Sequence, residues 1–390
     1  MFFLVVLFVI AVIVRDDFVF IVFYLIAIAY IFGRISSKRA FNSIKFARKF
    51  NSRAFLGETI PVSLEVTNTS WLPVVWLRIH ESIPINLLSP NFFNQVISLG
   101  PYGHTSYEYK LFARRRGYYK LGPISASSGD LLGMAGEYHS EGNLDYLTVY
   151  PMIVPFAKFT LPSRSPMGTL RHTQPIFEDP TRVTGKRDYI AGDSLRRIDW
   201  KTTAATGRLQ VKQYEPSIAL ETSIFLNLNA SEYEQHHRID SVELAIVIAA
   251  SIANWVTGQK QTVGFSTNGS DPIAEDQRVK TLPPRKSRGH LMRILDILAR
   301  VQSVETIPLV ELLRQESVHL SWGTTLIIIA GLADEALFDQ LFQVLRRGLD
   351  IMLILAGPVY NLKLIQQRAD YFGFPVYSFL NERDLYMWRQ

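Results

Sequence analysis

The chain has 390 residues, with 41 Lys and Arg against 35 Asp and Glu and no cysteine. This length predicts two or three domains rather than one. The net charge of +6 is modest for so long a chain, and the lack of cysteine excludes disulfide bonds and thiolate metal sites. The hydrophobic share of 48% is raised by the first 33 residues, so the remainder has the composition of an ordinary globular protein.

Two apolar runs open the chain, Phe2–Val14 and Phe18–Phe32, with the charged residues Arg15–Asp17 between them. One continuous span would place these charges near the bilayer midplane at a cost of about 3 kcal/mol each. As helices the runs reach about 20 and 23 Å, short of the roughly 30 Å hydrocarbon core. We therefore predict a transmembrane helical hairpin over residues 1–33, with local thinning of the bilayer. A cleaved signal peptide is not expected, because no Lys or Arg precedes the first run.

A basic segment follows the apolar runs, and no acid occurs between Asp17 and Glu58. Its seven cations are Arg34, Lys38, Arg39, Lys45, Arg48, Lys49 and Arg53. The positive-inside rule predicts that residues 34–54 form a basic cytoplasmic linker, so the chain is expected in the cell membrane with its soluble domains and both termini in the cytoplasm. No nucleic-acid partner is expected, because these cations are not interleaved on a folded surface.

Residues 55–150 are typical of a β-sandwich domain. Apolar and polar residues alternate over Glu58–Asn68 and Ser106–Arg114, and Gly-Pro and Ser-Gly-Asp turns separate the short runs. Residues 151–183 are rich in Pro, Ser and Thr and lack periodicity, so they are predicted as a connector.

The remainder of the chain alternates apolar strands with amphipathic helices. We expect strands at 222–228, 261–266, 324–330, 350–356 and 375–379, and helices at 239–256, 290–301, 335–347 and 360–371. Apolar strands between helices are typical of a parallel sheet covered on both faces. The sequence therefore predicts a doubly wound α/β domain.

Residues 184–216 read TGKRDYIAGDSLRRIDWKTTAATGRLQVKQYEP and contain the densest group of distinctive residues: Arg187, Tyr189, Gly192, Asp193, Arg196, Arg197, Asp199 and Trp200. The carboxylates of Asp193 and Asp199 are expected to pair with Arg187 and Arg196, and Trp200 offers a ring face to an arginine. A structural clamp with a docking surface is favoured over a catalytic cluster, because aspartate and arginine without histidine make a poor acid–base pair. We expect Tyr189, Asp199 and Trp200 to be structural and Arg196 and Arg197 to serve docking.

This pattern, R-x-Y-x-x-G-D-x-x-R-x-I-D-W-K, resembles the signature of the domain-of-unknown-function 58 family of membrane-anchored bacterial and archaeal proteins. The resemblance implies a von Willebrand factor A-like (Rossmann-like) α/β domain over residues 184–390, with the signature loop at its entry. It also implies a MoxR-type AAA ATPase and a transglutaminase-like membrane protein as partners, and a scaffold or adaptor role in assembling or maturing envelope complexes. Family members often carry Ala-Arg where this chain has Ala204-Ala205, so no role is transferred to that arginine.

The first strand of this domain ends in Asn227, Asn229 and Ser231, which resemble the metal-adhesion motif D-x-S-x-S with two positions changed. Neutral amides in place of these ligands remove the carboxylate attraction that a divalent cation needs. We therefore expect neither metal nor cofactor, and no enzyme activity. Two alternatives stay open: a membrane-anchored hydrolase or transferase that uses Asp193 and Asp199, and a metal-dependent adhesion module.

Overall fold

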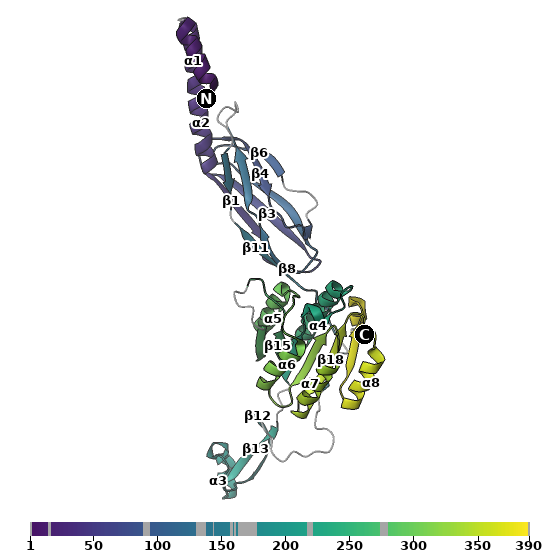
Figure 1. The fold of residues 1–390 in the computed structure, drawn as a ribbon. Coiled ribbons are helices and arrows are strands. Elements are labelled where there is room, and N and C mark those ends of the chain that lie inside the picture. Colours follow the sequence, from purple (N-terminus) through teal and green to yellow (C-terminus); the bar gives the residue numbers. More distant parts are fainter. Residues whose placement is uncertain are drawn as a thin grey trace. The chain divides into compact units, whose positions relative to one another are not determined.

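The computed structural model describes residues 2–14, 17–88, 94–129, 138–142, 144–156, 159, 161–162, 178–216, 221–273 and 280–388. The chain divides into two compact units, Met1–Met152 with Leu298–Arg300, and Ile153–Ile297 with Val301–Gln390. The first unit contains the N-terminal helices and the β-sheet domain. The second contains the signature residues and a six-stranded α/β sheet (Figure 1).

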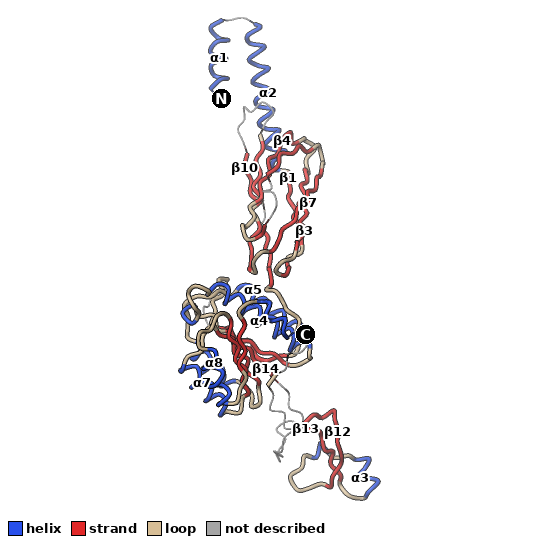
Figure 2. Tube along the Cα trace, turned by 90° about the vertical axis from the view of Figure 1, so that its right-hand side faces the viewer, coloured by secondary structure: helices blue, strands red, loops and turns tan. Residues whose placement is uncertain are grey.

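Two helices begin the first unit, α1 (Phe2–Val14) and α2 (Asp17–Asn42), and they lie side by side with the rings of Phe8 and Phe23 5.3 Å apart (Figure 2). Of these two, α2 is long and apolar enough to cross a membrane, whereas the 13 residues of α1 reach only about 20 Å. The structure therefore supports one N-terminal apolar helix of spanning length, and the two-helix transmembrane hairpin stays a prediction. Arg15 and Asp16, its expected tip, lie outside the described residues.

The prediction of a basic linker over residues 34–54 is wrong. Helix α2 continues through this segment to Asn42, and its last turn places Ala40 and Phe41 in the core of the β-sheet domain. Strand β1 (Ile44–Phe50) follows directly and pairs with β3 (Thr59–Asn68). Exposure alternates along this strand, with Lys45, Ala47 and Lys49 on the exposed face, which is the period of a strand with one buried face. The cations of this segment therefore belong to a folded element.

The first unit is a β-sheet domain, in agreement with the alternation of its sequence. One sheet has the order β1-β3-β7-β5, with β7 at His104–Ala113 and β5 at Leu87–Leu88. The other two sheets have the orders β10-β9-β4-β6 and β2-β11-β8. Their strands are β2 (Arg53–Phe55), β4 (Val74–Glu81), β6 (Asn94–Leu99), β8 (Gly117–Leu121), β9 (Ile124–Ser128), β10 (Tyr138–Glu141) and β11 (Asp145–Tyr150). Two clusters of buried apolar residues, which share contributions from β3, join the first sheet to each of the others.

The sheet of the second unit has the order β16-β15-β14-β17-β18-β19, and every neighbouring pair is parallel except β15 with β16. Its strands are β14 (Glu221–Leu226), β15 (Thr262–Thr267), β16 (Lys280–Arg285), β17 (Thr325–Ala330), β18 (Asp350–Ala356) and β19 (Val376–Phe379). The helices are α4 (Arg238–Gly258), α5 (Arg288–Arg300), α6 (Leu309–Glu316), α7 (Glu335–Arg346) and α8 (Leu362–Phe372). The predicted parallel α/β sheet is confirmed, although β16 and α6 were not foreseen.

The burial of this sheet is typical of parallel sheets, whose two faces are covered by the connecting helices. All six residues of β17 are buried, so helices cover both of its faces. Helices α6, α7 and α8 share one apolar cluster with Phe225, Ile328 and Leu353. Helix α4 contacts β14, β15, β17 and β18 but contributes nothing to that cluster. It is the second helix whose hydropathy would suit a membrane, yet 72% of its apolar window is buried, which identifies it as a core helix.

The connector predicted at 151–183 falls largely outside the described residues, and its last part is wrong. Residues Glu178–Asp188 form strand β12, which pairs antiparallel with β13 (Gln210–Pro216). Two bulges interrupt the register between Asp179 and Gly185. These irregular pairings hide the period of two on which a prediction of a strand depends.

A buried ion pair in the β-sheet domain generates the first testable prediction. Arg48 on β1 donates from Nε to Glu81 Oε1 at 2.6 Å, and both side chains are fully buried. Replacing Glu81 removes a carboxylate that balances the buried charge of Arg48. Glu81→Ala should therefore lower the free energy of unfolding by about 3–5 kcal/mol. Denaturant unfolding followed by circular dichroism measures this change.

The neighbouring exposed pair provides the control. Lys49 Nζ lies 2.6 Å from Glu65 Oε1, with 67% of the lysine side chain exposed. Solvent screening limits such a pair, so Glu65→Ala should cost no more than about 1 kcal/mol. Equal losses for the two variants would show that burial does not determine the strength of the Arg48 pair.

Candidate functional site

The signature residues form a small module of their own, residues 178–216, made of β12, β13 and the chain between them. In its ladder Lys186 faces Lys212, Arg187 faces Val211 and Asp188 faces Gln210. The intervening residues fold into a 3₁₀ turn, η1 (Leu195–Arg197), and a short helix, α3 (Trp200–Thr206). We call this the signature module; Figure 2 shows its two strands and α3.

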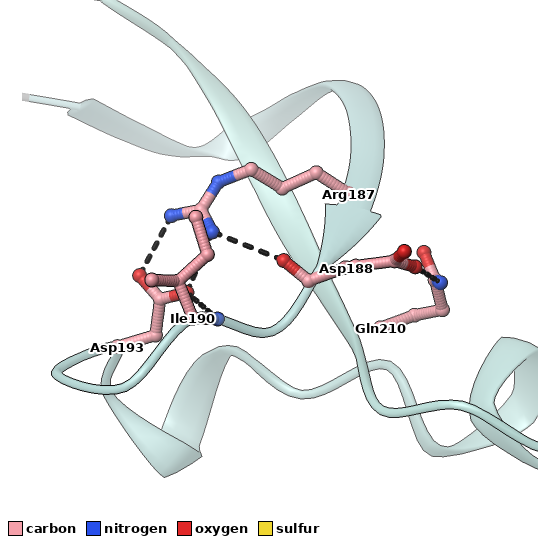
Figure 3. Close-up of polar contacts among 5 residues, drawn as sticks. All are labelled: Arg187, Asp188, Ile190, Asp193 and Gln210. Atoms are coloured by element: carbon pink, nitrogen blue, oxygen red, sulfur yellow. Dashed lines mark hydrogen bonds and ion pairs between the residues drawn. The ribbon is translucent and has the colours of Figure 1, made fainter.

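Arg187 holds the first turn of the signature module through Asp193. Its Nη1 and Nη2 donate to the two carboxylate oxygens of Asp193, each at 2.6 Å, and Figure 3 shows the guanidinium facing the carboxylate. Asp193 Oδ2 also accepts from the Ile190 amide at 3.0 Å, and Gly192 has a φ of 110°, which favours glycine. The hydrogen bonds from Arg187 and Ile190 lower the pKa of Asp193 to about 2.

Lys186, the preceding residue, holds the second part of the module through Asp199. Its ammonium lies 2.8 Å from Asp199 Oδ2 and also donates to the Thr202 hydroxyl. Asp199 caps α3 by accepting from the Thr202 amide at 3.2 Å. The hydrogen bonds from Lys186 and the Thr202 amide lower the pKa of Asp199 to about 2. The expected partnership of Asp199 with Arg196 is therefore wrong, because the adjacent strand supplies a cation closer to the cap.

The interior of the module is small and apolar. Ile198 and Val211 are buried and form a β-bridge, and the Asp199 amide donates to the Gln210 carbonyl at 2.8 Å. Tyr189 is half-buried and donates its amide to the Leu209 carbonyl at 2.9 Å. These contacts explain how the chain returns to β13 after α3.

Trp200 was expected to be structural, but it lies at the surface of the module. Trp200 is 68% exposed, whereas Ile198, two residues earlier, is buried. Arg196 and Arg197 are also exposed, and the Arg197 guanidinium lies 5.7 Å from the centroid of the Tyr214 ring. The structure thus brings Arg187, Gly192 and Asp193 together at one turn and leaves Arg196 and Trp200 on the surface.

The electrostatics limit what this module can do chemically. Both carboxylates are ionised at neutral pH, since each has a pKa of about 2, and each is engaged by a cation. A general acid or base works best with a pKa near the working pH. The arrangement of Asp193 and Asp199 therefore suits a structural role, and the exposed cations are the groups able to contact a partner.

The second candidate site lies at the carboxyl ends of the parallel strands. In the order β15-β14-β17-β18-β19 the chain reverses direction of winding between β14 and β17, where such folds commonly bind ligands. Asn227 follows β14 and is fully buried. Its Oδ1 accepts from the Asn229 amide at 3.0 Å and from Asn268 Nδ2 at 2.9 Å, and its Nδ2 donates to Glu232 Oε2 at 2.7 Å.

Side chains of the protein itself occupy this position at the ends of β14 and β17. Glu232 also accepts from the amide of Leu309 at 3.2 Å, so its carboxylate stabilises the start of α6, where the preceding proline makes no side-chain cap. The Tyr233 hydroxyl donates to the Asn227 carbonyl at 2.6 Å, and burial raises the pKa of this phenol. The Tyr233 ring packs on Gly331 after β17, where an added Cβ would lie 2.3 Å from the ring.

The neighbouring motif residues have comparable internal roles. Asn229 Oδ1 accepts from the amides of Ser231 and Thr306 at 3.4 and 3.3 Å, and Asp334 caps α7 through the Leu337 amide at 2.8 Å. Over the described ranges, no group of three or more histidines or carboxylates is placed to hold a metal ion. Glu232, Tyr233 and Asn268 were not predicted from the sequence, because the hydrogen bonds of this network join segments that are up to 77 residues apart.

Comparison with known proteins identifies the family of this region. Residues 185–327 match the family model described as "Protein of unknown function DUF58", and the chain carries a DUF58 family domain there. The chain is also 24% identical over 234 residues to the uncharacterized protein YeaD of Bacillus subtilis, an alignment that covers 57% of this chain and 56% of that relative. The chain thus matches little more than half the length of this relative.

Solved structures give partial likenesses. The CARDB domain of a Pyrococcus furiosus protein matches with a TM-score of 0.21 and 18% identity, covering 27% of this chain and 86% of that one. An aerotolerance-related membrane protein from Bacteroides fragilis matches with a TM-score of 0.29 and 13% identity, covering 42% of this chain and 92% of that one. TM-scores this low support no inference about function.

The buried amide network predicts the effect of restoring an acid at Asn227. Asn227→Asp places a second carboxylate against Glu232, and two like charges in a buried site raise the pKa of the pair. A raised folded-state pKa makes stability greatest at low pH, and that stability is lost as the pH rises above the unfolded value of about 4. The melting temperature of Asn227→Asp should therefore fall further below that of the wild type between pH 5 and pH 8.

Asn229→Asp is the matched control, because a carboxylate there still accepts from the two amides that Asn229 binds. It should change the melting temperature little over the same pH range. Millimolar magnesium or manganese should leave the wild-type melting temperature unchanged. A saturable shift that a chelator reverses would contradict the interpretation of this site as internally filled.

Proposed function

We propose that this DUF58 family protein is a membrane-anchored scaffold or adaptor that docks a MoxR-type AAA ATPase through the signature module. The observation that carries the proposal is the division of charges in the module. Asp193 and Asp199 are bound by Arg187 and Lys186, whereas Arg196 is exposed. Exposed charge of one sign steers a partner of opposite charge and contributes to specificity.

The ATPase is proposed from the family resemblance of the signature, and its work would be the assembly or maturation of envelope or other protein complexes. An adaptor needs one part fixed in place and another part exposed for binding. The exposed apolar length of α2 supports membrane anchorage, and the exposed side chains of η1 and α3 support docking. A transglutaminase-like membrane protein is a further proposed component.

We extend the proposal to the domain that carries this module, which we interpret as von Willebrand factor A-like. Two features support this: a parallel sheet that winds in both directions from β14, and the sequence N-x-N-x-S after that strand. The side chains of Asn227 and Asn229 form hydrogen bonds with neighbouring residues. We therefore favour a von Willebrand factor A-like domain that binds a partner without metal-dependent adhesion.

For the anchor, we propose that α1 and α2 form a transmembrane hairpin with the soluble units in the cytoplasm. The chain has no native cysteine, so single cysteines can report this topology. A membrane-impermeant maleimide added to intact cells should label Asp17→Cys, and should label Ser52→Cys and Ser321→Cys only after lysis. Labelling of the last two variants in intact cells would contradict the proposed orientation.

Charge reversal tests docking. Arg196→Glu and Arg197→Glu should each weaken binding of the purified ATPase at least about tenfold, because they place an acid against an acidic partner. Their melting temperatures should stay close to that of the wild type, since exposed charges contribute only about 0–1 kcal/mol. Calorimetric titration of the full chain in detergent measures the affinity.

Lys363→Glu, at an exposed position of α8, is the matched control and should bind as the wild type does. Arg196→Glu with unchanged affinity would refute docking through this module. The enzyme alternative has its own test, Asp193→Asn: a variant that keeps stability and ATPase binding but loses a measurable turnover would establish catalysis at the carboxylate.

A further inference from the structure

The signature module exposes large apolar side chains in addition to its cations. Trp200 and Leu195 are each 68% exposed, and Ile190 is 63% exposed. Leu195 lies in η1 and Trp200 opens α3, so four residues lie between them along the chain. Tryptophan is among the side chains that most often dominate protein interfaces, so its exposure here makes the module a candidate contact surface.

Trp200 is held rigidly although its side chain faces solvent. The residue before it, Asp199, is fixed by Lys186, by the Thr202 amide and by its own bond to the Gln210 carbonyl. Helix α3 then closes at Gly207, whose φ is 69°. A rigid backbone means that an exposed aromatic ring loses little conformational freedom when it binds, which favours affinity.

The charges around Trp200 indicate what it would bind. Between Gly185 and Tyr214 the chain carries seven Lys and Arg and three Asp. All three aspartates make hydrogen bonds inside the module: Asp188 accepts from Gln210, Asp193 from Arg187, and Asp199 from Thr202. Asp188 is itself exposed, but Arg187 and Lys186 engage Asp193 and Asp199, so the exposed Arg196 and Lys201 supply positive surface charge close to Trp200 in the chain.

We infer that Trp200 and Leu195 form the apolar anchor of the docking surface, and that the partner surface is an apolar pocket bordered by acidic residues. This inference rests on the proposed function, because it assigns the chemistry of the ATPase surface that the module would meet. Tryptophan and arginine are the side chains that most often dominate the energy of protein interfaces. A lipid surface fits less well: an interfacial helix needs a broad apolar face, and α3 has seven residues, three of them threonine.

The test uses the full chain in nanodiscs of zwitterionic lipid and the purified MoxR-type ATPase of the same genome as the probe. Trp200→Ala should weaken binding about 30-fold, as expected for an interface residue of high energy, and Trp200→Phe should keep most of the affinity. Trp71→Ala is the matched control, because Trp71 is 67% exposed in the β-sheet domain. Unchanged melting temperatures would show that the loss is one of binding.

The dependence of binding on ionic strength distinguishes the charged residues of the docking surface from its apolar residues. Rising ionic strength should reduce the defect of Arg196→Glu, because screening weakens charge contacts, but should preserve the defect of Trp200→Ala. If Arg196→Glu loses binding while Trp200→Ala and Leu195→Ala do not, the anchor is refuted and the proposed docking stands. If the wild type does not bind the ATPase, the proposed function is refuted.

A second measurement then decides the anchor. With a photoreactive benzoylphenylalanine at position 200 in cells, the inference requires a crosslink that maps to an acidic protein segment and that Arg196→Glu abolishes. A crosslink to lipid, or to a segment without acidic residues, or the absence of any protein crosslink, overturns it. Failure of the anchor is in this way distinguished from failure of the ATPase proposal.

Discussion

Two neighbouring cations on one strand, Lys186 and Arg187, determine the form of the signature module. Successive side chains of a strand point to opposite faces, so adjacent residues can hold two different segments. Arg187 binds Asp193 in the first turn, and Lys186 binds Asp199 at the start of α3. The pairs satisfy both carboxylates within the module, and the cations that follow in η1 are left at the surface.

In the α/β domain, polar side chains are buried and bind one another at the ends of the parallel strands. At the winding reversal between β14 and β17 the side chains of Asn227, Glu232 and Asn268 bind one another and nearby backbone groups, and Tyr233 covers Gly331. Buried polar groups are tolerated when they are satisfied in this way. At the place where such folds commonly bind a ligand, the side chains of Asn227 and Asn268 are thus part of the core here.

The sequence predicted the parallel sheet well because that part of the fold depends on local pattern. The run TLIIIA of β17 is apolar after its first residue and buried throughout, which is typical of a strand covered on both faces. Contacts between distant residues were not predictable: Arg48 was counted as a topology signal, yet its partner Glu81 lies 33 residues away. Trp200 was expected to be structural, with its ring face offered to an arginine, but the buried residues of the module are Ile198 and Val211, and Trp200 is exposed.

Helix α2 connects the apolar N-terminus to the β-sheet domain as one continuous helix. Its upper part exposes apolar side chains such as Phe18 and Phe32, whereas Ala40 and Phe41 are buried with residues of β3 and β4. The helical turns run on from Asp17 to Asn42, so the apolar segment and the buried last turn belong to one continuous helix. If the apolar part enters a bilayer, the same helix fixes the position of the β-sheet domain relative to that membrane. Anchorage through α2 would therefore hold the first soluble domain close to the membrane surface, because Ala40 and Phe41 of the same helix belong to the core of that domain.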